Sequence, residues 1–131
     1  MSLNPQIPIA SSILIVDKDP KKAIPVIREG EEYSVVIVNN GQEALTQVKQ
    51  RSYDVVLVDG NQPDKEALSL LGSLQQSNPH CPIVILSSML ETKDKSEFLN
   101  HGAFDFLRKP YTADEFNDTL RRALDLKPLE Q

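Results

Sequence analysis

Four short runs of mainly aliphatic and aromatic residues each lead into a polar side chain, and this arrangement constrains the fold most. The runs cover residues 13–16, 55–58, 83–86 and 104–107, and the polar residues that follow are Asp17, Asp59, Ser87 and, after Arg108, Lys109. Runs of this length and composition are typical of strands buried on both faces of a parallel sheet. Ligands of such sheets bind beyond the carboxyl ends of the strands. The sequence therefore predicts two carboxylates, a hydroxyl and an ammonium along one edge, a set that can bind a phosphoryl group.

A fifth apolar run, 35–38, predicts another strand, and the strands alternate with helix-like segments. This alternation is typical of repeated βα units. Asn40 is expected to cap one helix, with Glu43 reaching back, and Thr112 with Glu115 forms a capping box before the last helix. A further helix is expected over 93–100, ended by Gly102. Because short crossovers are right-handed, helices should cover both faces of the sheet. The predicted fold is α/β, a three-layer doubly wound parallel sheet.

The segment 19–30 is the only room for a helix after the first strand, and Pro25 lies in its middle. A proline inside a helix removes one hydrogen bond and clashes with the preceding turn, at a cost of about 3 kcal/mol. We therefore expect a short, kinked or interrupted helix there.

Composition bounds the class of protein. A chain of 131 residues suits one domain, and its net charge of −5 disfavours binding to nucleic acid or to anionic membranes. It contains no apolar stretch long enough to span a membrane and no basic, apolar start typical of a signal peptide. The single cysteine, Cys81, fits a reducing cytoplasm, where we expect the protein to work.

The ordered motifs resemble those of the bacterial response-regulator receiver domain, which has a flavodoxin-like (βα)5 fold with strand order 2-1-3-4-5. They are the segments 13–20, 53–63, 82–88 and 102–110. The resemblance implies one receiver domain over residues 12–126, with short tails at 1–11 and 127–131. It also implies that the chain acts in two-component signal transduction and is not an enzyme beyond accepting its own phosphoryl group.

The resemblance assigns a role to each strand-end residue. Asp59 is the expected phosphoacceptor, which agrees with the ability of carboxylates to form covalent intermediates. Ser87 is expected to donate its hydroxyl to the phosphoryl group, and Lys109 to neutralise its charge. Phe106 lies where the family has an aromatic switch residue, and Lys109–Pro110 is expected to be a cis peptide bond. Because Ser87 and Lys109 follow strand ends, we expect their substitution to cost little for folding.

The family's Mg²⁺ site is only partly matched. Asp17, Asp59 and the backbone carbonyl of Asn61 are the expected ligands. Receivers usually carry two acidic residues directly after the first strand, whereas here Lys18 occupies the second position. An ammonium repels Mg²⁺, so we expect metal binding to be weakened.

Three functional hypotheses remain from the sequence, and a fourth, a flavin carrier on the same fold, is disfavoured because no Ser/Thr/Gly-rich phosphate loop follows the first strand. The first is a receiver that accepts phosphate on Asp59 from a sensor histidine kinase or phosphotransfer protein and then contacts a downstream protein or output domain. The second is a pseudo-receiver that works without phosphorylation, with Lys18 replacing the metal charge. The third is a phosphatase with an aspartyl nucleophile. A homodimer through the family's fourth helix, fifth strand and fifth helix is expected as an option of the first two.

Overall fold

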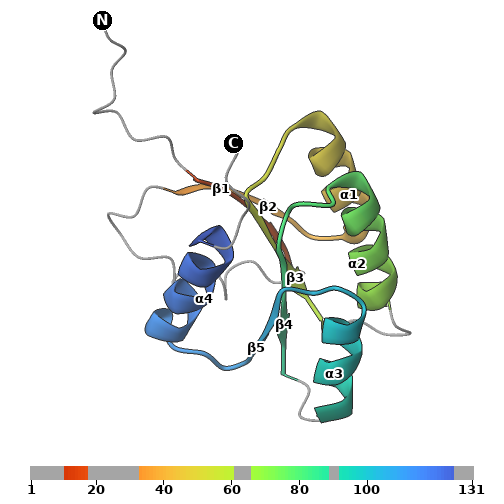
Figure 1. Ribbon diagram of the computed structural model, residues 1–131. Coiled ribbons are helices and arrows are strands. Elements are labelled where there is room, and N and C mark those ends of the chain that lie inside the picture. The colour runs from red at the N-terminus through yellow and green to blue at the C-terminus, as the bar shows by residue number, and fades with distance from the viewer. Residues whose placement is uncertain (1–10, 18–32, 61–65, 89–91, 126–131) are drawn as a thin grey trace, which may run out of the picture.

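A computed structural model describes residues 11–17, 33–60, 66–88 and 92–125 of the chain (Figure 1). These residues form one sheet of five parallel strands in the order β2-β1-β3-β4-β5. The strands are β1 (Ser11–Val16), β2 (Tyr33–Val38), β3 (Val55–Asp59), β4 (Ile83–Ser87) and β5 (Asp105–Arg108). The predicted fold class and strand order are therefore confirmed. The expected helix around Pro25 lies outside the described residues.

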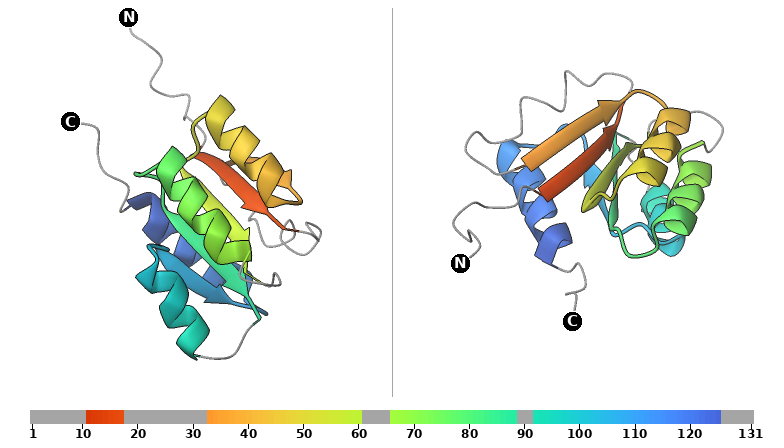
Figure 2. Two further views of the ribbon diagram at one scale, coloured as in Figure 1. Left: turned by 90° about the vertical axis from the view of Figure 1, so that its right-hand side faces the viewer. Right: turned by 90° about the horizontal axis from the view of Figure 1, so that it is seen from above.

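Helices cover both faces of the sheet, as the sequence predicts. They are α1 (Gly41–Gln50), α2 (Glu66–Ser77), α3 (Thr92–Asn100) and α4 (Ala113–Asp125). α1, α2 and α3 lie on one side of the sheet and α4 on the other (Figures 1 and 2). Within the described ranges, none of these helices has the length and apolar character needed to cross a membrane.

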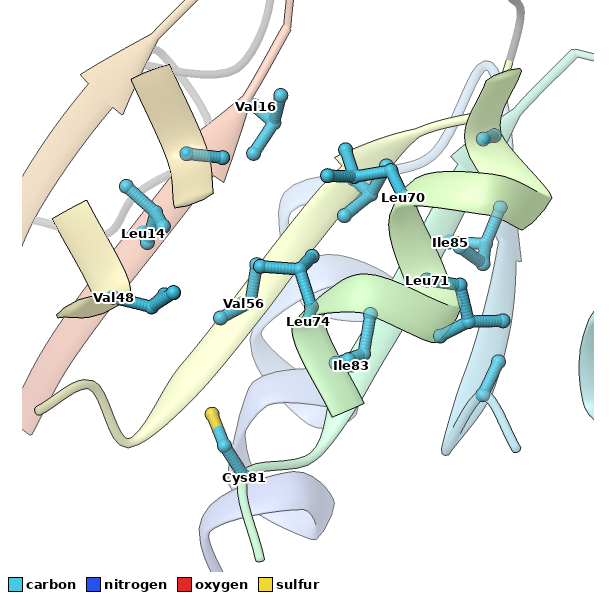
Figure 3. Close-up of a cluster of buried hydrophobic side chains, with 14 of the residues drawn as sticks. Leu14, Val16, Val48, Val56, Leu70, Leu71, Leu74, Cys81, Ile83 and Ile85 are labelled. Atoms are coloured by element: carbon cyan, nitrogen blue, oxygen red, sulfur yellow. The ribbon is translucent and has the colours of Figure 1, made fainter. Parts of the chain in front are cut away.

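The central strands are continuous apolar runs because both of their faces are buried. Alternate residues of β1, β3 and β4 pack under α1, α2 and α3; they are Leu14, Val16, Val56, Val58, Ile83 and Ile85. Figure 3 labels all of them except Val58. The residues between them, Ile13, Ile15, Val55, Leu57, Val84 and Leu86, pack on the opposite face with Phe116, Leu120 and Ala123 of α4. Side chains of a strand alternate between faces, so a strand with both faces covered needs no polar position.

The helix ends follow the predicted capping. Asn40 Oδ1 accepts a hydrogen bond from the Glu43 amide at 2.9 Å. The Glu43 carboxylate reaches back to the Asn39 amide at 3.3 Å, one residue earlier than expected. At α4, Thr112 and Glu115 exchange reciprocal bonds of 3.0 and 2.9 Å. Such caps satisfy amides that have no partner inside the helix and so fix where each helix begins.

We predict that substitution by alanine has opposite effects on stability at two glycines, Gly72 and Gly102. Gly72 lies exposed within α2, with nothing within 4 Å of an added Cβ. Gly72→Ala should raise the free energy of unfolding by about 0.5–1 kcal/mol, because alanine loses less backbone entropy in a helix.

Gly102 has φ +102°, and a Cβ added to it would meet the side chain of Gln75. Gly102→Ala should lower stability by about 1 kcal/mol or more. Urea denaturation of both variants checks this, and equal effects of the two would contradict it.

Candidate functional site

The four predicted site residues lie at the carboxyl edge of the sheet. Asp17 directly follows β1, Asp59 and Ser87 are the last residues of β3 and β4, and Lys109 directly follows β5. The register pairs Val16 with Val58, Asp59 with Leu86, and Ser87 with Arg108. Because all the strands are parallel and paired in this register, the four strand ends stop at similar heights.

Lys109 joins the two carboxylates. Its Nζ lies 3.2 Å from Asp59 Oδ1 and 3.8 Å from Asp17 Oδ2. Asp17 and Asp59 are only 4% and 6% exposed, so their charges have lost most of their contact with water. Buried charges are tolerated when they are paired. One ammonium therefore compensates two neighbouring carboxylates, and it reaches across the sheet from β5 to β1 to do so.

The positions of β4 and β5 at this edge are fixed by main-chain hydrogen bonds. The Lys109 amide donates to the Ser87 carbonyl at 2.9 Å, and the Gly60 amide donates to the Leu86 carbonyl at 2.6 Å. Ser87 is fully buried at 0% exposure. Ser87 therefore does not lie at an exposed strand end, as the sequence suggests, although the small folding cost expected for its substitution stays a prediction. The Lys109–Pro110 bond is cis, as predicted.

Tyr111 was not singled out by the sequence analysis, although it directly follows Lys109–Pro110. Its ring stacks on Phe116 of α4, with centroids 5.5 Å apart and an interplanar angle of 23°. Burial raises the pKa of Tyr111, and the negative charges of Asp17 and Asp59 raise it further. The phenol is thus held neutral beside the acidic end of the site. Its sequence position next to Lys109 is the only signal that could have indicated this.

Phe106 lies on β5, separated from Asp59 of β3 by the intervening strand β4. It pairs with Ile85 across β4 and β5, and it packs on the cluster beneath α1, α2 and α3. Its ring centroid lies 6.1 Å from that of Phe98 in α3. The structure therefore brings Asp17, Asp59 and Lys109 into direct contact and leaves Phe106 in a separate aromatic pair behind them.

The carboxylates fit part of a magnesium site. Among the described residues no cluster of three or more His, Cys, Asp and Glu side chains could hold a metal. Asp17 and Asp59 nevertheless present oxygens that converge on one cation, the ammonium of Lys109. Mg²⁺ is usually bound by one or two carboxylates, with water and phosphate completing the shell. The donor set is thus suitable for Mg²⁺, while Asn61 and Lys18 lie outside the described residues.

This combination of a doubly wound parallel sheet with an acidic, lysine-bridged edge agrees with the comparison to protein families. The family model for the response regulator receiver domain matches residues 13–121 of this chain. The chain belongs to this family, whose members act in two-component signal transduction and are phosphorylated on an aspartate. The resemblance described from the sequence motifs is confirmed.

Curated relatives are longer than this chain. It is 32% identical over 114 residues to the transcriptional regulatory protein ZraR of Escherichia coli K12, covering 86% of this chain and 26% of that protein. It is 32% identical over 105 residues to the cell cycle response regulator CtrA of Brucella ovis, covering 79% of this chain and 45% of that protein. The chain thus spans less than half the length of these relatives.

Solved structures show the same fold. A CheY-like receiver domain protein from Methanospirillum hungatei has a TM-score of 0.81 at 26% identity, with 91% of this chain and 97% of that chain covered. The receiver domain of the Francisella response regulator 1452 has a TM-score of 0.77 at 30% identity, with 88% and 97% covered. Both structures are isolated receiver domains of similar extent.

The small folding cost that the sequence suggests for substitution of Lys109 does not account for its two buried ion pairs, and we now predict that Lys109→Met destabilises the fold. Methionine keeps the length of the side chain but leaves two buried carboxylates without their shared cation. Loss of one partner of a buried pair costs about 3–5 kcal/mol, and because Lys109 is 19% exposed we expect about 1–3 kcal/mol. Urea denaturation at neutral pH measures the loss.

Two further variants make this test specific. Adding Asp17→Asn to Lys109→Met removes one of the stranded charges and should recover part of the loss. Arg121→Met breaks an ion pair with Asp118 whose side chains are 58% and 66% exposed, and it should change stability by no more than about 0.5 kcal/mol. If Lys109→Met costs no more than Arg121→Met, the buried ion pair contributes nothing to stability.

Proposed function

We propose that Asp59 is the residue that accepts the phosphoryl group in this receiver domain, from a sensor histidine kinase or a phosphotransfer protein. The observation that carries the proposal is the buried carboxylate of Asp59 at the end of the central strand β3, 3.2 Å from the Lys109 ammonium. A carboxylate held in this way has a fixed direction of attack, and its cation is already in place. Preorganised charges of this kind lower the barrier of group transfer because they need no reorganisation.

The proposed step is a direct transfer. An oxygen of Asp59 forms a bond to phosphorus while the bond from phosphorus to the donor's histidine nitrogen breaks, and that nitrogen keeps the electron pair. Lys109 then faces the added negative charge as a point cation. Ser87, at the end of the neighbouring strand, can donate its hydroxyl hydrogen to a phosphoryl oxygen. We infer no further catalytic activity, since the domain's own aspartate is the acceptor.

Asp17 and Asp59 would hold Mg²⁺, with the Asn61 carbonyl as the third protein ligand by resemblance. When bound, Mg²⁺ supplies positive charge to the phosphoryl oxygens and to the acceptor carboxylate. The ammonium of Lys18, directly after Asp17 in the sequence, would oppose metal binding by repulsion. We therefore propose that this receiver binds Mg²⁺ more weakly than one with an acidic residue at that position.

The signal would leave the domain by contact with another protein or with an output domain. The relatives described above are transcriptional and cell cycle regulators of greater length, which supports an output domain as the partner. Phe106 is the proposed switch residue, with Phe98 as its resting neighbour at 6.1 Å. A change in the rotamer of Phe106 would alter the face formed by α3, β5 and α4. We propose the same face as the interface of any homodimer.

Phosphorylation should occur at Asp59 alone. Incubation with phosphoramidate and Mg²⁺ should add one phosphoryl group by intact-mass analysis, and Asp59→Asn should abolish the addition because the amide is not a nucleophile. Asp118→Asn, at a carboxylate that is 66% exposed on α4, is the matched control and should be labelled like the wild type. Labelling that persists in Asp59→Asn would end the assignment.

Substitution of Lys18 should restore a stronger metal site. Lys18→Asp replaces a repelling charge with a possible ligand, and Mg²⁺ affinity should rise by at least about tenfold, equivalent to about 1.4 kcal/mol. Calorimetric titration of both proteins with Mg²⁺ checks this. Lys49→Asp in the last turn of α1 gives the same change of net charge away from the site and should leave the affinity within about twofold. Equal affinity of wild type and Lys18→Asp would mean that Lys18 does not oppose the metal.

A further inference from the structure

Gly60, the residue after Asp59, lies unusually close to strand β4. Its amide donates to the Leu86 carbonyl at 2.6 Å, which continues the pairing of Asp59 with Leu86 by one residue. A Cβ added to Gly60 would lie 2.7 Å from Ile85 Cγ2 and 3.3 Å from Ser87 Cβ. The backbone of Gly60 is outside the left-handed region. Glycine is therefore needed at this position for space, and any other residue could adopt the same torsion angles.

Ile85, whose Cγ2 would lie 2.7 Å from the added Cβ, cannot move away easily. Carbon atoms in contact normally lie about 3.5–4.0 Å apart. Ile85 is fully buried in the cluster beneath α1, α2 and α3 (Figure 3). Its branched side chain is stiff about the first torsion, so the γ-methyl group cannot simply turn away. Because protein interiors are close-packed, a side chain at position 60 would move the end of β3 away from β4.

Such a movement would reach the reacting groups on both sides. Asp59 precedes Gly60 directly, and Ser87 follows the carbonyl to which Gly60 binds. The Ser87 carbonyl in turn accepts the Lys109 amide at 2.9 Å. The close approach at Gly60 thus links the acceptor carboxylate to the hydroxyl on β4 and to the cation after β5.

We propose that Gly60 is a positioning residue for phosphoryl transfer, because its lack of a side chain lets Asp59 approach Ser87 closely enough for both to act on one phosphoryl group. This inference rests on the proposed role of Asp59. Group transfer is sensitive to such spacing, since a misplacement of about 1 Å can reduce the rate about a hundredfold.

The test compares rates of phosphorylation by phosphoramidate at saturating Mg²⁺, followed by intact mass. Gly60→Ala should lower the rate by at least about tenfold relative to wild type. Gly72→Ala is the matched control, since it adds the same methyl group in open space, and it should keep the wild-type rate. Gly60→Ala combined with Ile85→Leu removes the offending γ-methyl at constant volume and should return the rate to within about threefold of wild type.

A second measurement separates positioning from general loss of structure. The amide chemical shifts of Ser87 and Lys109 should move in Gly60→Ala and return in the double variant, without any phosphorylation. The thermal midpoint should likewise fall in Gly60→Ala and recover in the double variant. If Gly60→Ala does not fold, the double variant carries the test, and a folded double variant that stays slow overturns the proposal.

The remaining outcomes are also decisive. A Gly60→Ala rate within about threefold of wild type, in a protein of unchanged fold, overturns the inference while leaving Asp59 as acceptor. A slow Gly60→Ala that Ile85→Leu does not rescue shows that the contact with Ile85 is not the cause, and it also overturns the inference. Absence of labelling in the wild type itself is the distinct failure of the proposed function, and the inference falls with it.

Discussion

Parallel pairing of β1, β3, β4 and β5 in one register is the constraint on which the site depends. The polar residues lie far apart in the sequence, and no local interaction brings them together. A shift by one residue would move every side chain to the other face, so the register is fixed by how the particular buried side chains fit on each face. The hydrophobic core therefore determines the distance between Asp59 and Lys109 as strictly as it determines the fold.

The cluster at the strand ends combines buried charges of both signs. Two buried carboxylates share one ammonium, so the three groups have a net negative charge. A phosphoryl group would add further negative charge at the same place. A further cation at the same place would compensate this added charge. Mg²⁺, which prefers oxygen ligands and phosphate, has the chemistry for this.

Much of the architecture could be predicted because it depends on local patterns. Runs such as 13–16 predict buried strands, and Asn40 and Thr112 predict helix starts from the chemistry of their side chains. The burial of Ser87 could not be predicted, because it depends on how distant parts of the chain pack around the end of β4. The same holds for Gly60, where an added side chain would meet Ile85 of the next strand, and for Tyr111, whose pKa is raised by burial and by the charges of Asp17 and Asp59.

The two aromatic contacts near the site differ in how deeply their rings are buried. Tyr111 stacks on Phe116, which is 1% exposed and belongs to the core beneath α4. Phe106 is only partly buried and meets Phe98 at 6.1 Å with the rings tilted by 39°. A ring with partial burial loses less packing when it changes rotamer than a ring fully enclosed in the core. Phe106 could therefore change rotamer at a lower packing cost than Phe116 could.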